Sequence, residues 1–429
     1  MLGRLNVGGG SKINGLIEEY VVASGGNVNA GDFVKFVNDS SVSTQLSTSM
    51  YSGKNISAVA LSSNKIFIAH ADGEHNLLYG LVCKIDNNII TKGTELLLDY
   101  ASYSGLIISV VALSSNKVFV VHEGGTNNNT LIGAVCTIEE TTITKETGTT
   151  LILSTNLYKT SLSAVALSSE KIFITYNDGE DDLLYGFVCT ISGTTISKGK
   201  NTKLSSKLAS AHKLSAVALS SNKVFISHMY GSGDLFLSGL VCTIEGTNIT
   251  KGTDTRLSSF STIGDITSTV ALSMDKIFIT YGFNNNLYSM ICTVDKTSII
   301  PGTDTLLESN KSIGGGLSAV TISPNKVFVI YSTGSNCNGL VCTIDETNIT
   351  AYEDTILGSL VGKIPVATAL SLGKVFIAYN FGSLEYLYGI AHATYNAVKT
   401  VDSLEDTIIG VAKIKGTSGQ IVKVYVPDV

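Results

Sequence analysis

The chain has 429 residues, of which 44% are hydrophobic and only 15% are charged, so apolar material for a large folded core is plentiful. This balance excludes a disordered protein, whose composition is poor in hydrophobic residues. The formal net charge is −6 and no basic run stands out, which argues against nucleic acid as a partner, because binding to phosphates needs clustered Lys and Arg.

The amino-terminal residues 1–15 (MLGRLNVGGGSKING) lack the apolar stretch of a signal peptide. The longest apolar run, residues 106–113, is interrupted by Ser109 and is far too short to cross a bilayer. We therefore expect a protein that is made soluble and has no membrane insertion.

A repeated pattern dominates the chain, and its first copy is SAVALSSNKIFIAH at residues 57–70. The central Phe of each copy follows the previous one after 48 to 54 residues, at Phe67, Phe119, Phe173, Phe225, Phe278, Phe328 and Phe376. No unit shows helical spacing of its apolar residues, which excludes helical solenoids, and the period is too long for a β-helix.

Each unit predicts four strands. The first is SxVAL and the second is K(I/V)F(I/V), with a short polar turn such as Ser63-Asn64 between them. The third is YGLVCTI, and the fourth runs through a segment such as ITKGTDTRL at residues 249–257. The first three strands are apolar on both faces, and stacking the units face to face covers both. The sequence therefore predicts an all-β fold, a seven-bladed β-propeller.

Two segments compete to close the ring of blades. Residues 42–47 (VSTQLS) resemble a fourth strand that precedes the first complete unit. Residues 405–410 (EDTIIG) resemble residues 353–358 (EDTILG), a fourth strand in its usual place. Pairing either segment with the last unit removes the open sheet edges, and both alternatives stay open at this level.

The two chain ends differ in character from the repeats. Residues 18–37 and 406–429 contain alternating apolar strands interrupted by Gly turns, and neither is large enough to bury a core alone. The ends of a closed propeller lie near each other. We therefore expect one small β domain made from residues 1–38 and 403–429, with the propeller inserted as residues 39–402.

The segments AGDFVKFV (30–37) and IIGVAKIKGTSGQIVKVYV (408–426) resemble the small β domain of phage capsid decoration, or cement, proteins. Similar ends frame proteins of clostridial phage and prophage structural regions. The resemblance implies synthesis in the bacterial host cytoplasm, a place on the virion surface, and phage capsid or tail proteins as partners. The residues that it implies for docking on the particle are Asp32, Phe33, Val34 and Tyr425.

The same resemblance implies a propeller that is displayed outward and adheres to bacterial surface carbohydrate. A tail-fibre or receptor-binding protein is an alternative, with the same binding chemistry at another place on the phage particle. A free lectin or a glycan-acting enzyme is the alternative of another class. The absence of Trp argues against a lectin that stacks sugars strongly.

Six cysteines occupy the same place in the third strand of six units, and His392 takes that place in the last. They are Cys83, Cys136, Cys189, Cys242, Cys292 and Cys342. Equivalent positions in neighbouring blades lie beyond disulfide reach and diverge around the ring, so neither disulfides nor a metal site is expected. These thiols are interpreted as small buried hydrophobic groups, and Cys337 as a free thiol in a loop. No metal and no cofactor is predicted.

A ring of His and Tyr, three residues after each Phe, provides the first candidate ligand-binding set. As a girdle on one face or near the channel these side chains suit stacking on a sugar. The simpler interpretation, which we favour, is that they end the second strand and pack against the next blade. These belt residues are His70, His122, Tyr176, His228, Tyr281, Tyr331 and Tyr379.

The loops that follow the belt residues vary most between units, and binding residues are often carried on such loops. In the third unit Asp178, Glu180, Asp181 and Asp182 cluster enough to suggest calcium. The spacing of a calcium-binding DxDxDG loop is absent, so a solvated acidic turn is the favoured interpretation. Asp178, Glu180 and Asp182 complete the candidate ligand-binding residues.

No catalytic motif supports an enzyme. The chain has no GxSxG, no HExxH and no Gly-rich phosphate loop after a strand. Paired carboxylates of the glycosidase kind depend on the fold and stay open. The acidic residues of the repeats fall in turns and loops, where solvation explains them, and we predict a non-enzymatic protein.

Overall fold

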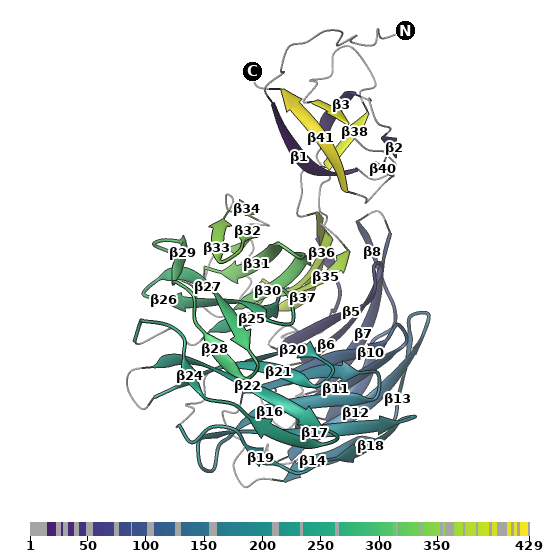
Figure 1. Cartoon of the computed structure of the whole chain (residues 1–429). Helices are drawn as coiled ribbons and strands as arrows, with labels where there is room; N and C mark the ends of the chain where they lie inside the picture. Colours follow the sequence, from purple (N-terminus) through teal and green to yellow (C-terminus); the bar gives the residue numbers. More distant parts are fainter. Residues whose placement is uncertain are drawn as a thin grey trace. The chain divides into compact units, whose positions relative to one another are not determined.

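A computed structural model shows an all-β chain arranged as a seven-bladed propeller, which confirms the predicted fold class (Figure 1). The residues that the structure describes are 15–22, 27–28, 33–37, 43–48, 55–72, 77–86, 88–100, 107–124, 130–153, 161–207, 214–231, 235–261, 266–311, 313, 316–333, 336–351, 355–356, 364–371, 374–382, 385–393, 397–400, 410–412, 416–417 and 421–427. The described residues include no helix with the length and hydropathy needed to cross a membrane.

Blade one sets the pattern of the ring. Its strands are β5 (Ile56–Ser62), β6 (Lys65–Asp72), β7 (Leu77–Asp86), β8 (Ile89–Lys92) and β9 (Leu96–Tyr100). The first four follow one another as an antiparallel sheet, and β9 pairs with β7 beyond the end of β8. The fourth strand expected from the sequence is therefore two short strands separated by a bend.

Blades two to six repeat this order. Blades two and three comprise β10 (Ile108–Ser114), β11 (Lys117–Gly124), β12 (Thr130–Glu139), β13 (Thr142–Lys145), β14 (Thr149–Leu153), β15 (Leu162–Ser168), β16 (Lys171–Asp178), β17 (Leu183–Ser192), β18 (Thr195–Lys198) and β19 (Thr202–Lys203). Blades four to six comprise β20 (Ser215–Ser220), β21 (Lys223–Tyr230), β22 (Phe236–Glu245), β23 (Asn248–Lys251), β24 (Thr255–Arg256), β25 (Thr267–Ala271), β26 (Lys276–Phe283), β27 (Asn286–Asp295), β28 (Ser298–Ile300), β29 (Thr305–Glu308), β30 (Leu317–Ser323), β31 (Lys326–Ser332), β32 (Cys337–Asp345), β33 (Asn348–Ala351) and β34 (Thr355–Ile356).

Blade seven closes the ring with a strand from the other end of the propeller. Its strands are β35 (Val366–Ser371), β36 (Lys374–Phe381), β37 (Tyr386–Ala393) and β4 (Thr44–Gln45). In the last pair, Tyr388 lies opposite Gln45 and Gly389 opposite Thr44. Of the two segments that competed for this role, residues 42–47 are therefore the closing strand. Of residues 405–410 only Gly410 is described, and it belongs to β39.

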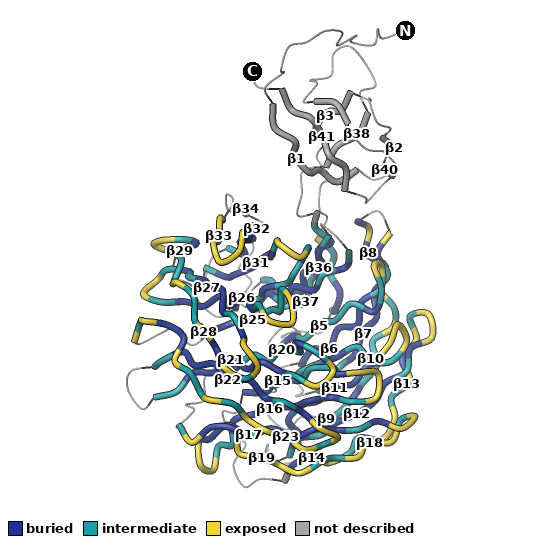
Figure 2. Tube along the Cα trace, in the orientation of Figure 1, coloured by how far each residue is buried: buried dark blue, intermediate teal, exposed yellow. Residues whose placement is uncertain are grey.

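The first strand of each blade lies innermost. These strands contact one another in a cycle, from β5 through β10, β15, β20, β25 and β30 to β35 and back to β5. Figure 2 shows buried residues running through the middle strands of the blades and exposed residues at their turns. Each blade is thus covered on both faces by its neighbours, as the doubly apolar strands require.

The repeated Phe lies in the cores between blades. Phe173 is fully buried and belongs to a cluster with Leu204 of its own blade and Val224 and Ile226 of blade four. A Cβ on Gly186 would lie 3.1 Å from Cζ of Phe173 and 2.8 Å from Cδ1 of Leu204. The repeated Gly of the third strand is therefore required by the close packing of the Phe ring and a Leu over it.

The cysteines of the third strands are buried and free, as predicted. Burial raises the pKa of the thiols of Cys83, Cys136 and Cys189 to about 12, so they stay protonated at neutral pH. His392, in the corresponding place of blade seven, has its pKa lowered to about 4 by burial. The loop expected for Cys337 is wrong, because this residue begins β32 and is 2% exposed.

Strands from both chain ends form a closed five-stranded sheet of their own. Its members in order are β1 (Gly15–Val22), β38 (Ala397–Thr400), β3 (Phe33–Val37), β39 (Gly410–Ala412) and β41 (Ile421–Pro427), and a separate pair joins β2 (Asn27–Val28) to β40 (Gly416–Thr417). The chain divides into one compact unit made mainly of residues 1–41 and 393–429 and another that holds the blades. The boundaries placed at 38 and 402 stay predictions. β38, inside the range 39–402, pairs with β1 and β3.

The cores between blades make the Phe173→Ala variant a direct test of the repeat. Truncating a fully buried ring leaves a cavity between blades three and four, so the free energy of unfolding should fall by about 3–5 kcal/mol. Chemical denaturation measures this change, with Met274→Ala as the control because that side chain is 71% exposed. A loss below about 1 kcal/mol for Phe173→Ala would contradict the blade assignment at this strand.

Candidate functional site

The belt residues all lie on the second strands of their blades, and none is more than 1% exposed. A ring without an exposed face cannot stack on a sugar from solvent. Their burial therefore favours the packing interpretation over the girdle, and direct contact of these seven side chains with a ligand stays a prediction.

The histidines of the belt face carboxylates. His70 Nε2 lies 3.0 Å from Glu95 Oε1, and His228 Nε2 lies 3.3 Å from Asp254 Oδ2. Glu95 and Asp254 occupy the same place in their blades, directly before the outermost short strand. The bend between the two short outer strands thus places a polar side chain next to the belt residue of its blade.

The tyrosines of the belt use the same position. Asn201 Nδ2 donates a hydrogen bond of 3.0 Å to Tyr176 Oη, and the Tyr281 hydroxyl donates to Asp304 Oδ1. In blade seven the Tyr379 and Ser43 hydroxyls are 2.6 Å apart. In blades one, three, five and seven, the buried His or Tyr is thus hydrogen-bonded by the residue that precedes the outermost strand. His228 of blade four faces Asp254 at 3.3 Å, but neither of its ring nitrogens has a hydrogen-bond partner among the described residues.

In blade two the buried His takes its partner from the neighbouring blade. Gly148 stands where the other blades carry a polar side chain, so His122 has no such partner in its own sheet. Instead, His122 Nε2 lies 3.3 Å from Asp99 Oδ2 of blade one. Asp99 follows the last buried Leu of blade one, the position held by Ser205 in blade three. The carboxylate is supplied by the neighbouring blade.

Serines that follow the outermost strands extend the contact across the blade boundary. Ser205 donates to Asp254 Oδ2 over 2.6 Å, and Ser259 donates to Asp304 Oδ2 over 2.6 Å. Burial would raise the pKa of Asp254, but His228 and the hydroxyls of Ser205 and Ser238 hold it well below its usual range. This carboxylate is therefore ionised at neutral pH.

Half-exposed tyrosines lie beside four of the belt residues. They precede the repeated Gly of the third strand, or Ser289 in blade five, and stack on the belt at ring-centroid distances of 5.8 to 6.1 Å. They are Tyr79, Tyr185, Tyr288 and Tyr388. These tyrosines are not among the residues predicted for the site, although the YG pattern that carries three of them is visible in the repeat.

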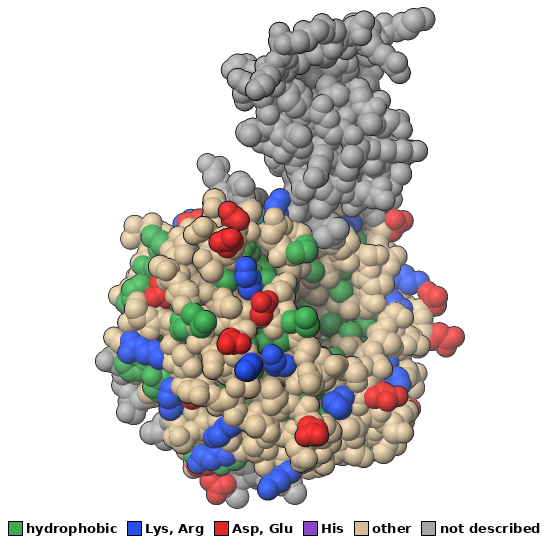
Figure 3. Space-filling model, viewed as in Figure 1, with side chains coloured by type: hydrophobic (Ala, Val, Ile, Leu, Met, Phe, Trp, Pro, Cys, Tyr) green, Lys and Arg blue, Asp and Glu red, His purple; other side chains and the backbone are tan. Residues whose placement is uncertain are grey.

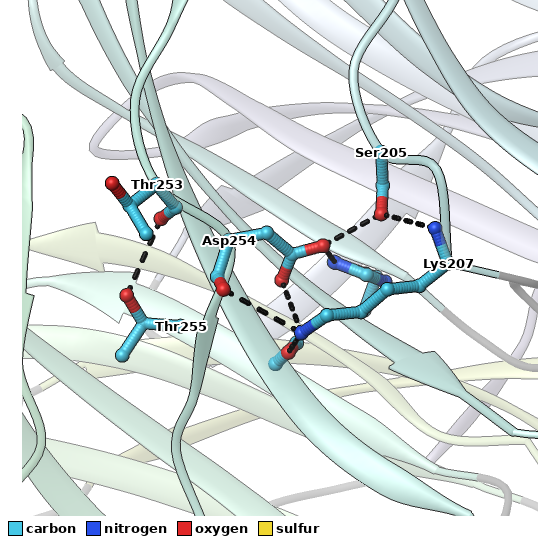
Figure 4. Close-up of polar contacts among 7 residues, drawn as sticks. Ser205, Lys207, Thr253, Asp254 and Thr255 are labelled. Carbon is cyan, nitrogen blue, oxygen red and sulfur yellow. Dashed lines mark hydrogen bonds and ion pairs between the residues drawn. The ribbon is translucent and has the colours of Figure 1, made fainter.

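Blade four carries the densest polar group of this region, the Lys207–Asp254 cluster (Figure 4). Lys207 follows the outermost strand of blade three and donates from Nζ to Asp254 Oδ1 over 3.2 Å and to Ser238 Oγ over 3.1 Å. Its Nζ also lies 4.1 Å from the ring centroid of Tyr230. Figure 4 shows Ser205 and Lys207 approaching Asp254 from the same segment.

Two rings and a second cation continue this cluster. The rings of Tyr230 and Phe236 are 5.5 Å apart, and the guanidinium of Arg256 lies 4.3 Å from the ring centroid of Phe236. Arg256 is oriented by backbone carbonyls, since its Nε donates to Ser258 O and its Nη2 to Ser259 O, each over 2.9 Å. Tyr230, Phe236 and Arg256 all retain solvent-exposed surface.

Blade five presents an aromatic cluster at the equivalent place. Phe260 stacks on Phe283 at 4.4 Å with an interplanar angle of 10°, and it lies 4.9 Å from Tyr288. All three rings are half-buried. Phe260 occupies the position of Lys207 in blade four, and Phe283 that of Tyr230. The two blades therefore carry the same arrangement, charged in blade four and apolar in blade five.

The acidic turn of blade three uses its carboxylates locally. Asp178 Oδ1 accepts from the backbone N–H of Glu180 over 3.0 Å, and Asp181 Oδ2 accepts from the Tyr185 hydroxyl over 2.8 Å. Asp182 is exposed and adopts a left-handed φ of 55°. Within the described residues no three His, Cys, Asp or Glu side chains gather to hold a metal ion.

Of the predicted docking residues, Phe33 and Val34 lie in β3, and Tyr425 lies in β41 opposite Ile17 and Val411. Asp32 lies outside the described residues. Several of the variable loops also lie outside them, among them residues 73–76, 125–129 and 232–234. A role of these positions in docking stays a prediction.

No protein-family model matches the chain, and no curated protein matches it. Solved structures match by fold. BP39L lectin from Burkholderia pseudomallei aligns with a TM-score of 0.60 and 9% identity over 82% of this chain and 98% of that chain. A candidate 6-phosphogluconolactonase from Bacteroides fragilis aligns with a TM-score of 0.52 and 9% identity over 79% and 98%. These likenesses establish the β-propeller architecture, which lectins and enzymes share.

The buried carboxylate of Asp254 predicts a pH dependence of stability. Its pKa is lower in the folded than in the unfolded chain, where it is about 3.9, so its contribution is present above that pH and is lost as the pH falls through the folded pKa. Replacing Asp254 by Asn should cost about 1–3 kcal/mol at pH 7. The difference from the wild-type chain should shrink below about pH 4.

Denaturation curves between pH 3 and pH 7 measure this difference. Asp182→Asn is the matched control, because Asp182 is exposed and lies in a turn that Asn also accepts. A gap between the wild-type chain and Asp254→Asn that stays constant over this range would show that the carboxylate is not the stabilising group.

Proposed function

We propose that this chain is a non-enzymatic, carbohydrate-binding β-propeller. The observation that carries the proposal is the pair of clusters on blades four and five. In each, half-exposed aromatic rings lie beside a carboxylate held in place by the belt, Asp254 in blade four and Asp304 in blade five. The lectin-like propeller fold is consistent with this function.

A sugar presents an apolar C–H face and an edge of hydroxyl groups. The first suits an aromatic ring such as that of Phe260 or Tyr288, and the second suits fixed acceptors and donors. The rings here are held by stacking on one another, which lowers the entropy lost when a ligand binds. The clusters therefore combine both kinds of contact without requiring Trp.

The carboxylates support a binding role over a catalytic one. Asp254 faces His228, Lys207 and Ser205, while Asp304 accepts from Tyr281 and Ser259. The contacts of Asp254 hold its pKa well below its usual range, whereas a general acid needs a raised pKa and access to substrate. Asp304 is occupied by the two hydroxyl groups that donate to it. On the face seen in Figure 3, cationic and anionic side chains are interspersed over a mostly uncharged surface, which is no platform for a polyanionic nucleic acid.

We further propose that the chain-end strands dock this propeller on a phage particle, so that the protein resides on the virion surface. The support is the resemblance of residues 30–37 and 408–426 to phage capsid decoration proteins. A tail-fibre or receptor-binding position is the alternative. In either place, a carbohydrate-binding ring held outward would bring the particle to the bacterial surface.

A glycan array probed with the purified chain tests the carbohydrate proposal. Phe260→Ala removes the ring that stacks on Phe283 and contacts Tyr288, so binding to the best neutral glycan should weaken about tenfold. Met274→Ala is the control, because this exposed side chain makes no ring contact. If no glycan on the array binds the wild-type chain, the carbohydrate proposal fails.

Immunogold electron microscopy of induced phage particles, with antibody against the purified chain, tests the virion proposal. Label spread over the head is the expected result for a capsid decoration protein. Gold confined to the tail tip would instead support the receptor-binding alternative. Intact particles without label would remove the virion proposal and leave a free lectin.

A further inference from the structure

We infer that the blade-four site, which comprises Lys207, Tyr230, Phe236, Asp254 and Arg256, prefers a sugar that carries a carboxylate. This inference rests on the proposed carbohydrate function and adds the class of ligand. It is argued from the orientation of one guanidinium, from the charges around it and from a comparison with the equivalent positions of the other blades.

Arg256 has part of its guanidinium committed and part open. Nε donates to Ser258 O and Nη2 to the carbonyls of Ser259 and Phe260, the last over 3.3 Å. One face of the group covers Phe236. Among the described residues Nη1 makes no hydrogen bond, and the side chain is exposed. A fixed, solvent-facing donor of this kind is suited to a carboxylate.

The described residues of the site carry a positive excess. Among them two cations, Lys207 and Arg256, stand against the one carboxylate of Asp254, in a chain whose formal net charge is −6. The Lys207 ammonium bonds to Asp254 and Ser238, so within the described part of the site Arg256 is the cation that faces no carboxylate. The carboxylate of Asp304 accepts hydrogen bonds from the hydroxyl and the N–H of Ser259.

The rings of the site supply the rest of a sugar-binding surface. The rings of Tyr230 and Phe236 lie 5.5 Å apart, and Lys207 and Arg256 each cover one face of a ring. A pyranose in this site therefore contacts the ring surface that the cations leave open, with the Arg256 guanidinium beside it. An uronic acid offers an apolar face to such rings and a carboxylate at its edge. The neutral sugars expected at blade five lack that second group.

Arg256 differs from the residues at the equivalent position of the other blades. Pairing with the third strand places at this position Leu97, Thr150, Lys203, Leu306, Ile356 and Gln45. Only Lys203 is cationic, and blade three has Asp178 opposite Leu183 where blade four has Tyr230 opposite Phe236. The combination of an oriented cation with two rings occurs in blade four alone among these positions.

The test compares two probes of the same shape and different charge. Isothermal titration at low salt measures the affinity of the full chain for trigalacturonic acid and for its fully methyl-esterified form. We expect the wild-type chain to bind the acid about tenfold more tightly than the ester. Added salt should weaken binding of the acid and leave binding of the ester unchanged.

Arg256→Gln should abolish this preference by lowering affinity for the acid alone, and Arg256→Lys should restore part of it. Lys203→Gln is the matched control, because Lys203 occupies the same place in blade three, where Asp178 and Leu183 replace the ring pair Tyr230 and Phe236, and it should leave the ratio unchanged. Thermal midpoints close to that of the wild-type chain show that each variant is folded.

Equal affinity of the wild-type chain for both probes, or a ratio that Arg256→Gln leaves intact, overturns the inference. Binding of neither probe also overturns it. Each of these results is distinguishable from failure of the proposed function, because the array of neutral glycans and the Phe260→Ala variant report on blade five independently.

Discussion

The packing of one blade against the next is the interaction on which this structure depends. Each sheet is apolar on both faces, so no blade is stable in water until neighbours cover it. The fully buried Phe of the second strand, exemplified by Phe173 against Val224 and Ile226, provides the centre of each interface. Because every blade needs two neighbours, the ring must close, and the strand β4 in blade seven follows from the same requirement.

Polar groups are arranged around this apolar packing so that few remain unpaired. The belt residues bring a His or Tyr into every interface, and in blades one, three, five and seven the residue before the outermost strand supplies a hydrogen-bond partner. Blade two shows that the requirement belongs to the interface and not to the single sheet, since Asp99 of blade one replaces the side chain that Gly148 lacks. This fixed framework also positions the carboxylates beside the half-exposed rings of blades four and five.

The repeat made the blades, their Phe cores and their buried cysteines predictable, because period and strand patterning are local properties of the chain. The closing strand was not predictable, since residues 42–47 and 405–410 both resemble a fourth strand. The belt and its packing against the next blade were also predictable from the repeat, but its polar partners were not, because they lie in the variable segment before the outermost strand. The Lys207–Asp254 cluster was missed for the same reason: Lys207 follows blade three and makes its contacts in blade four.

The closing pair of strands also has a mechanical consequence. The chain enters the propeller at β4, shortly after β3, and leaves it at β37, shortly before β38. These two strands are antiparallel neighbours, so the start of β4 and the end of β37 lie at the same end of blade seven. A force that acts on the propeller through the chain-end strands is therefore shared by β4 and β37. It does not make one of these strands slide along the other. A connection of this kind resists sliding between β4 and β37, the pair of strands that closes the ring.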